Sequence, residues 1–305
     1  MSILDTPLCK LLGVRFPIVQ APMANNAGTA LAAAVSAAGA LGSVAGATIS
    51  PGELRADIHE VRSATDRPFA VNLFAPPYLR EENLDVVVDE RPAALLFTFG
   101  IVDPAPLQDA GIVVLGTATT AEEARALEQA GVDAVVAQGA EAGGHRGSFL
   151  GGWPLVPLAE LVPACVDAVS LPVVAAGGIM DGAGIARLLQ LGAAGVSLGT
   201  AFLFTPEAGR PPEHLEALRT LETVVTDAYT GRPMRAARTP VLEELMAAPP
   251  PLPFPEQRQV SAEKGPLFMG GTRAAEGREL AAAELVRLLV SEATWTRPPR
   301  KPASS

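Results

Sequence analysis

Eight short apolar runs alternate with segments rich in Ala and Leu between residues 17 and 198, and this alternation constrains the fold most. Apolar runs of this length are typical of buried parallel strands. They lie at 17–21, 41–45, 69–73, 93–98, 112–115, 134–137, 172–176 and 195–198. Strands that alternate with helices indicate an α/β fold with a parallel sheet, and eight strands close a TIM (β/α)8 barrel.

The segments between the runs carry helix signals. Helices are predicted over 29–38, 51–62 and 121–129, and Ser50 followed by Pro51 is a typical helix start. A doubly wound open sheet is the alternative architecture. No Gly-x-Gly-x-x-Gly motif follows the first apolar run, which counts against a dinucleotide-binding half.

The chain divides into four predicted parts. Residues 1–205 form the barrel core, and 206–280, rich in Pro and charge, form an irregular extension with one or two helices at the barrel mouth or a dimer surface. Residues 281–296 form a terminal helix that packs on the barrel, and 297–305 a disordered tail. The long link over 139–171 is interpreted as an active-site insertion.

Composition excludes several classes of function. The chain has 305 residues, is 18% charged and has a formal net charge of −10 without a basic run, so nucleic acid is not an expected partner. Cys9 and Cys165 are too few for a disulfide framework, which fits a reducing cytoplasm. Residues 16–52 carry no charge, but their Ala, Gly and Pro content argues against a membrane span, and no signal peptide is visible. No cluster has metal-ligand spacing, so no metal is expected.

The sequence QGAEAGGHRG at 138–147 is the strongest candidate for chemistry. It follows a predicted strand and places His145 in a loop with four glycines. Loops at the carboxyl ends of barrel strands carry the catalytic groups of such enzymes, and His titrates near neutral pH. The alternative is a Gly-rich turn with a solvated His.

Two further motifs predict a phosphate site. AAGGI at 175–179 ends the seventh predicted strand and SLGT at 197–200 ends the eighth. In β/α barrels the loops after these strands commonly bind phosphate through backbone N–H groups. The candidate residues are Gly177, Gly178, Ser197, Leu198, Gly199 and Thr200. Tight turns at strand ends are the alternative.

These motifs, taken in order, resemble the nitronate monooxygenases, formerly called 2-nitropropane dioxygenases. The resemblance rests on PIVQAPMA at 17–24, PFAVNLF at 68–74, the 138–147 loop, the two glycine motifs, TDAYTG at 226–231 and AAELV at 282–286. It implies a TIM barrel that binds FMN and acts on a small-molecule substrate. Flavin-dependent enoyl-acyl-carrier-protein reductases and NADH:quinone reductases share most of these motifs.

The resemblance also implies roles for individual residues. The flavin ring would lie over Ala21, Pro22 and Met23, although a Met in this position is as often plain core. Asn72, Gln138 and the Gly143 backbone would contact the flavin or its ribityl chain, and Gly178 with 197–200 would hold the phosphate. His145 would be the active-site base, a role that a pKa near neutrality suits. Asn72 as a structural loop-former, and Glu141 as a loop-stabilising acceptor, are the alternatives.

Three functions follow as hypotheses. The first is FMN-dependent oxidation of alkyl nitronates such as propionate-3-nitronate by O2. The second is NAD(P)H-dependent reduction of a quinone or an enoyl thioester, and the third is flavin binding without efficient turnover. Many relatives carry a His where this chain has Thr98. His59 and His214 are both interpreted as surface residues. Met269 begins a Gly-rich turn that is expected near the substrate.

Overall fold

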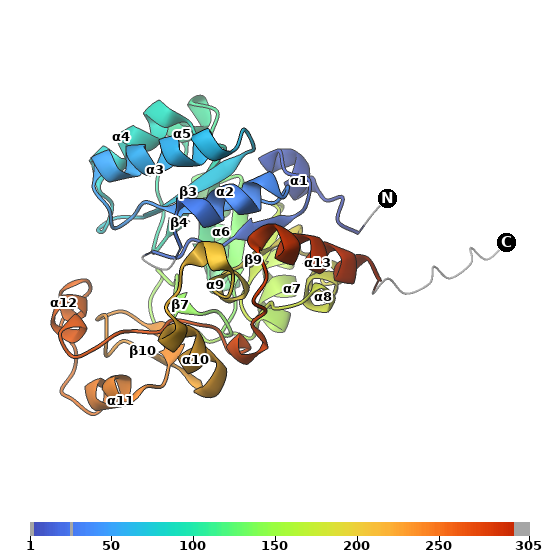
Figure 1. Cartoon of the computed structure of the whole chain (residues 1–305). Helices are drawn as coiled ribbons and strands as arrows, with labels where there is room; N and C mark the ends of the chain where they lie inside the picture. The colour runs from blue at the N-terminus through green and yellow to red at the C-terminus, as the bar shows by residue number, and fades with distance from the viewer. Residues whose placement is uncertain (1–2, 25–26, 296–305) are drawn as a thin grey trace.

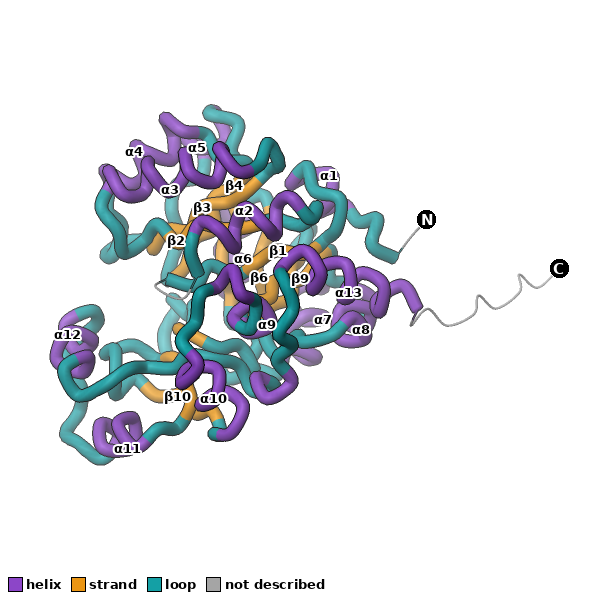
Figure 2. Tube along the Cα trace, viewed as in Figure 1, coloured by secondary structure: helices purple, strands orange, loops and turns teal. Residues whose placement is uncertain are grey.

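Eight parallel strands form one sheet that curls into a barrel in the computed structural model, which describes residues 3–24 and 27–295. Neighbours follow the order β1-β9-β8-β6-β5-β4-β3-β2, and Figure 2 shows these strands at the centre with helices around them. The barrel strands are β1 (Ile18–Gln20), β2 (Gly42–Ala45), β3 (Phe69–Phe74), β4 (Ala94–Thr98), β5 (Val113–Ala118), β6 (Ala134–Gln138), β8 (Val173–Ala176) and β9 (Gly195–Leu198). The predicted TIM barrel is therefore confirmed.

Strand β1 closes the barrel because it bonds on both of its edges. On one side Ile18 and Gln20 align with Val196 and Leu198 of β9. On the other, the Gln20 backbone N–H donates to the carbonyl of Leu41 at 2.8 Å, next to a parallel bridge between Val19 and Leu41. The first and the last strand of the barrel are thus joined directly.

The barrel interior is filled by apolar side chains rather than left as a channel. Val19, Leu41 and Leu96 belong to an inner cluster that includes Leu8 and Leu12 of α1 (Pro7–Leu12). Helix α1 thus supplies apolar side chains to the barrel interior. A second, larger cluster lies between the strands and the surrounding helices, as expected when both faces of a parallel sheet are covered.

The helices lie outside the strands, and α13 joins the two ends of the barrel (Figure 1). It packs against α8, which precedes the last barrel strand, and against α2, which follows the first. The surrounding helices are α2 (Thr29–Ala37), α3 (Pro51–Ala64), α4 (Glu81–Glu90), α5 (Ala105–Asp109), α6 (Ala121–Ala130), α7 (Leu158–Ala168), α8 (Gly182–Gln190), α9 (Thr200–Leu203) and α13 (Ala282–Trp295). The predicted start of α3 is confirmed, since Ser50 makes a capping box with Glu53. The predicted tail at 297–305 lies outside the described residues.

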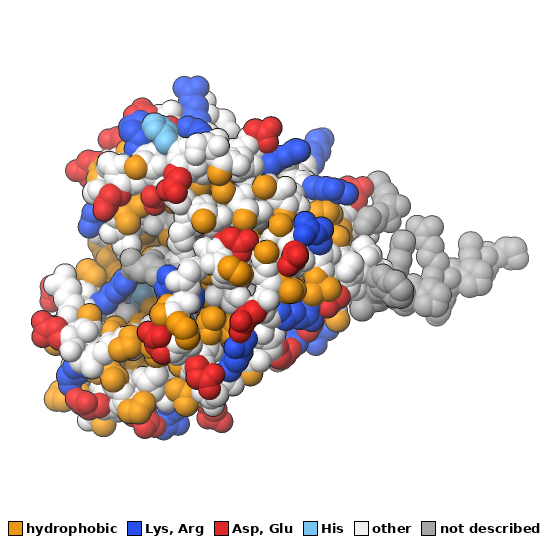
Figure 3. All heavy atoms as spheres, in the orientation of Figure 1, with side chains coloured by type: hydrophobic (Ala, Val, Ile, Leu, Met, Phe, Trp, Pro, Cys, Tyr) orange, Lys and Arg blue, Asp and Glu red, His pale blue; other side chains and the backbone are white. Residues whose placement is uncertain are grey.

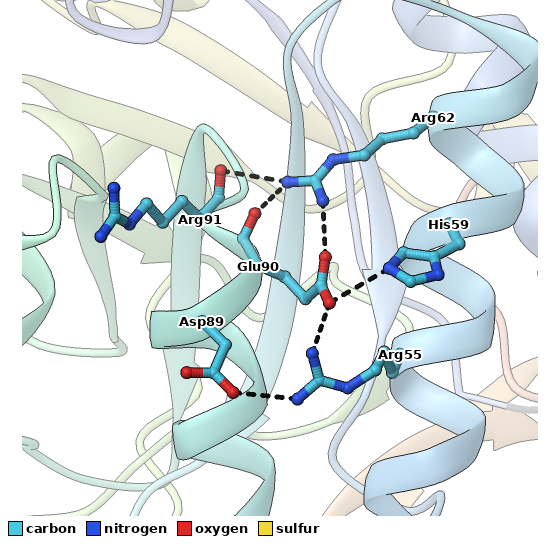
Figure 4. A network of polar contacts seen from close by, with 6 residues as sticks. All are labelled: Arg55, His59, Arg62, Asp89, Glu90 and Arg91. Atoms are coloured by element: carbon cyan, nitrogen blue, oxygen red, sulfur yellow. Dashed lines mark hydrogen bonds and ion pairs between the residues drawn. The ribbon is translucent and has the colours of Figure 1, made fainter.

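Helices α3 and α4 are tied together chiefly by the carboxylate of Glu90 (Figure 4). Glu90 accepts hydrogen bonds from Arg55 at 2.5 Å and from Arg62 at 2.6 Å, and lies 3.1 Å from His59 Nε2. Arg55 also pairs with Asp89. Burial disfavours the charged form of Glu90, but hydrogen bonds from Arg55 and His59 outweigh it and lower its pKa. The His59 side chain is 59% exposed, which confirms its predicted surface position.

The extension after residue 205 is more regular than predicted. Instead of one or two helices it holds α10 (Pro212–Thr220), α11 (Pro240–Met246) and α12 (Glu256–Ala262), and a strand pair, β10 (Thr223–Thr226) and β11 (Met234–Ala237). Strand β11 also pairs with β7 (Gly144–His145), so three antiparallel strands form a second sheet. The loop that carries His145 is therefore bonded to the extension.

Both cysteines are free thiols. Cys9 and Cys165 are not bonded to each other, and Cys165 is buried.

In the described part of the chain, no helix is both long enough and apolar enough to cross a bilayer.

Candidate functional site

One cavity of about 470 Å³ lies where the carboxyl ends of the barrel strands meet the extension. Its walls combine strand ends such as Ser197 and Gln138 with Tyr229, Phe254 and Phe268 of the extension. Figure 3 shows the surface hollowed between these two parts of the molecule, with Lys or Arg side chains in the hollow. Barrel enzymes place their active sites at this end of the strands.

All of the residues predicted to be catalytic or to bind the cofactor line this cavity. They come from five separate stretches of the chain, which the parallel strands bring to one edge. They are Ala21, Pro22, Met23, Asn72, Gln138, Gly143, His145, Gly177, Gly178, Ser197, Leu198, Gly199 and Thr200. The shared location is a structural fact, whereas the individual roles stay predictions.

The glycine motifs form a tight recess with free donors. Gly178 has a φ of +65°, a conformation that suits glycine, and a Cβ there would lie 2.9 Å from the Cβ of Glu141. Among the described residues, no acceptor pairs with the amide N–H of Gly178 or of Gly199. The hydroxyl of Thr200 accepts a hydrogen bond from Gly271 at 2.9 Å, which leaves its own proton free to donate. The recess therefore offers several donors to an anionic group.

The Gly-rich turn that begins at Met269 belongs to the same recess. A Cβ on Gly143 would lie only 2.5 Å from the carbonyl carbon of Gly270, so the two backbones are in direct contact. The backbone N–H of Thr272 donates to the carbonyl of Glu141. This turn therefore fixes the loop that carries His145.

Asn72 and Gln138 each use part of their hydrogen-bonding capacity within the protein. Asn72 lies inside β3, not in a loop, and its Nδ2 donates to the Leu96 carbonyl at 2.9 Å and lies 3.2 Å from Thr98 Oγ1. Gln138 donates to the His145 carbonyl and accepts from Gly147. The Asn72 oxygen and one Nε2 proton of Gln138 keep their bonding capacity.

The protonation pattern of His145 follows from its hydrogen-bond partner. His145 aligns with Met234 across the second sheet, and its Nε2 lies 3.2 Å from the hydroxyl of Thr230. That hydroxyl donates its single proton to the carbonyl of Arg232 at 2.7 Å. Since Thr230 can only accept from the ring, Nε2 carries the proton and Nδ1 is left as the acceptor.

Aromatic rings enclose His145 and keep it uncharged. The ring centroids of Phe99 and Phe254 lie 5.7 and 5.4 Å from that of His145, both edge-on. Burial, reinforced by the positive charges of Arg258 and Arg232, lowers the pKa of His145 to about 3. The sequence could not predict this shift, because it does not show which aromatic and basic residues surround the ring.

Phe99 itself has an unusual backbone. Its φ is +79°, a region that non-glycine residues rarely adopt and that costs of order 1–3 kcal/mol. Its ring packs against Phe74 and lies 3.9 Å below the guanidinium of Arg232. These contacts hold a strained residue in the wall of the cavity, and the sequence alone does not indicate the strain.

Arg146, beside His145, is a structural residue that no sequence pattern indicates. Its side chain is fully buried, and its guanidinium donates to the carbonyls of Gly139 at 2.6 Å and Gln138 at 2.9 Å. Burial lowers its pKa to about 10. Glu141 accepts from the Leu158 N–H, as the loop-stabilising alternative predicts. The two charged side chains therefore brace the loop from inside.

The predicted surface position of His214 is wrong. His214 is 2% exposed, its Nε2 lies 3.3 Å from the Met269 carbonyl, and its ring packs on Phe268. It shares one face of α10 with the buried Ala217 and Leu218, a spacing of three and four residues. The Pro-rich setting hides this amphipathic pattern.

Acidic and metal-binding groups are scarce in this region. No Asp or Glu lines the cavity in the described part of the chain. Across residues 3–24 and 27–295, no three His, Cys, Asp or Glu side chains gather in a way that could hold a metal ion. The chemistry of the site therefore rests on backbone amides, His145, arginines and aromatic rings.

Comparisons with known proteins agree on one family. The nitronate monooxygenase family model matches residues 5–86 and 77–292. A nitronate monooxygenase from Pseudomonas aeruginosa is 41% identical over 93% of this chain and 97% of its own, and a probable one from Staphylococcus saprophyticus is 37% identical over 85% and 86%.

Solved structures give the same picture. A nitroalkane oxidase from Streptomyces ansochromogenes superposes with a TM-score of 0.87 at 35% identity, covering 94% of this chain and 97% of that one. FabK from Thermotoga maritima superposes with a TM-score of 0.83 at 32% identity, covering 96% and 97%. The match of family model, sequence and fold over most of the chain shows that it belongs to the nitronate monooxygenase family of oxidoreductases.

Proposed function

We propose that this chain binds FMN in the cavity and oxidises alkyl nitronates, such as propionate-3-nitronate, with O2. The observation that supports this most is that the unpaired amides of Gly178 and Gly199 line the same cavity as the uncharged ring of His145. One part of the cavity thus suits a phosphate, and another suits a small reactive anion. Family membership is consistent with both.

The residues present fit FMN. Gly178, Gly199 and the Thr200 hydroxyl would donate to the terminal phosphate, in a recess too tight for a Cβ at Gly178. Ala21, Pro22 and Met23 offer an apolar wall for the flat ring, and Asn72 and Gln138 keep polar atoms that could meet its edge. When bound, the flavin supplies the capacity to accept electrons from the substrate and pass them to O2.

The state of His145 favours nitronates over neutral nitroalkanes as substrates. A nitronate is already anionic, so its oxidation needs no proton removal. A neutral nitroalkane must first lose its α-proton, and Nδ1 of His145, with a conjugate-acid pKa of about 3, is a weak base for that step. His145 can still accept or donate hydrogen bonds to a bound substrate.

A reductase is the alternative function. Under it, NAD(P)H would reduce the flavin, and a quinone or an enoyl thioester would be the electron acceptor. Two observations favour it: the likeness to FabK, and a cavity whose lining also includes His214 and Phe268 of the extension, where a second ligand could bind.

Anaerobic mixing separates these functions. The yellow protein is mixed with propionate-3-nitronate, NADH or NADPH, and the flavin absorbance is followed. Rapid bleaching by the nitronate, and O2 consumption when air is admitted, supports the proposal. Rapid bleaching by a pyridine nucleotide alone would support the reductase, and no change with any of the three would leave a flavin-binding protein without efficient turnover.

A further inference from the structure

Arg258 brings an uncompensated positive charge to the cavity. It lies in α12 and lines the cavity together with His145 and Tyr229. No oxygen in the described part of the chain accepts a hydrogen bond from its guanidinium. By contrast, Arg219 and Arg238 of the same extension are each paired with a glutamate.

The backbone at Arg258 is held in place by the neighbouring residue, Gln257. Gln257 is buried, donates to the carbonyl of Ala228 at 3.2 Å and to the hydroxyl of Ser261 at 2.9 Å, and accepts from Leu252 at 2.9 Å. The first turn of α12 is therefore anchored beside Tyr229. Long side chains lose less freedom on binding when their backbone is fixed in this way.

Nothing in the cavity wall neutralises this charge. None of the described lining residues is Asp or Glu. The Tyr229 hydroxyl donates to the Gly265 carbonyl at 2.6 Å, and burial raises its pKa, so the phenol stays neutral. Arg210, another lining residue, adds a second positive charge.

We propose that Arg258, with His145 and Tyr229 beside it, forms a subsite for a planar two-oxygen anion on the substrate, a carboxylate or a nitronate group. A guanidinium binds such a group through two parallel hydrogen bonds, which a neutral amide or ester cannot match. Arg258 thus selects small organic anions. That the anion is a nitronate rests on the proposed function, whereas selection of anions does not.

Binding of a redox-inert anion tests the subsite without turnover. Purified holoprotein is titrated calorimetrically with propionate and with propionamide, its neutral analogue of the same shape. Wild type should bind propionate more tightly than propionamide. Arg258→Met should weaken propionate binding about ten- to a hundredfold and leave propionamide unchanged, since the loss is that of a charged hydrogen bond.

Two variants control this experiment. The affinity of Arg258→Lys for propionate should lie between those of wild type and Arg258→Met, because an ammonium keeps the charge but lacks the two parallel N–H donors of a guanidinium. Arg238→Met removes the same charge from the extension's exposed surface and should bind propionate like wild type. If Arg258→Met does not fold, Arg258→Gln replaces it. Equal propionate binding by wild type and a folded Arg258 variant, or no preference of wild type for propionate over propionamide, would overturn the proposal.

Turnover identifies the oxygen pair that Arg258 binds. Propionate-3-nitronate carries a carboxylate and a nitronate group, and propyl-1-nitronate carries only the latter. A rise in KM for both in Arg258→Met assigns the nitronate group, and a rise only for the first assigns the carboxylate. If neither compound is oxidised by wild type while propionate binding still depends on Arg258, the proposed function fails and the anion subsite stands.

Discussion

His145 is uncharged at neutral pH, because burial and the neighbouring guanidiniums lower its pKa. Thr230 fixes the proton on Nε2, so only Nδ1 can accept a proton or a hydrogen bond. This arrangement favours a residue that orients an anion over one that removes protons repeatedly. The chemistry expected of the site is therefore that of a substrate that arrives already ionised.

Replacement of His145 by Ala should separate two activities. His145→Ala should retain flavin and oxidise pre-formed nitronate, because no proton is removed in that reaction. Turnover of the neutral nitroalkane should fall by about 10²-fold, the low end for a lost general base, because a pKa of about 3 makes His145 a weak one. Steady-state O2 consumption with each substrate measures both. An equal loss of the two activities with flavin intact would assign His145 to binding instead.

Replacement of Gly178 should test the phosphate recess. Gly178→Asp should weaken FMN binding at least about tenfold relative to Gly178→Asn, since only the former places a carboxylate beside a phosphate. Asn is the matched control because both side chains tolerate a positive φ and have the same size. Heat release and chromatography identify the flavin, and fluorescence titration of the apoprotein gives its affinity. Equal affinities of the two variants, or FAD as the released flavin, would contradict the assignment.

At the scale of elements, Glu90 bonds α4 to α3 through several donors at once. Glu90→Gln should lower the free energy of unfolding by about 1–2 kcal/mol, as the charge-assisted bonds from Arg55 and Arg62 are lost. Because the pKa of Glu90 is lowered in the folded state, its contribution is present above its unfolded value and is lost as the pH falls.

Urea unfolding at pH 7 and at pH 3 measures this difference between wild type and Glu90→Gln. The stability gap should be larger at pH 7 than at pH 3. Glu216→Gln, at an exposed position on α10, is the matched control and should change little at either pH. A gap that does not depend on pH would show that packing of the side chain, and not its charge, is what matters.

The elements differ in how far the sequence predicts them. The barrel strands could be predicted because each is a local apolar run, and the glycine motifs because paired glycines at a strand end indicate a backbone that turns sharply or meets a ligand closely. The second sheet could not be predicted, because β7 has only two residues and pairs with β11, which lies about 90 positions further along the chain. Arg258 and Phe254 could not be predicted for the same reason: only the folded extension brings them to His145.

For the whole molecule, His145 makes stability depend on pH. Its pKa is about 3 when folded and about 6.5 in an unfolded chain, so only the unfolded state takes up this proton between those values. The free energy of unfolding should therefore fall as the pH drops below about 6.5, by up to about 1.4 kcal/mol per pH unit from this residue. Denaturation of wild type and His145→Gln, with equal flavin content, at pH 8, 7, 6 and 5 measures it. The wild-type curve should fall more steeply, and parallel curves would show that His145 titrates normally.

The joint between β1 and β9, with α13 laid across both ends of the barrel, has a consequence for protein synthesis. Residues 18–20 leave the ribosome well before their partners at 196–198, and α13, the helix that covers the joint, follows later still. Since domains begin to fold as they emerge, the nascent barrel has an open sheet edge until residues 196–198 emerge. Chaperones that shield such an edge therefore have most to protect before β9 has been made.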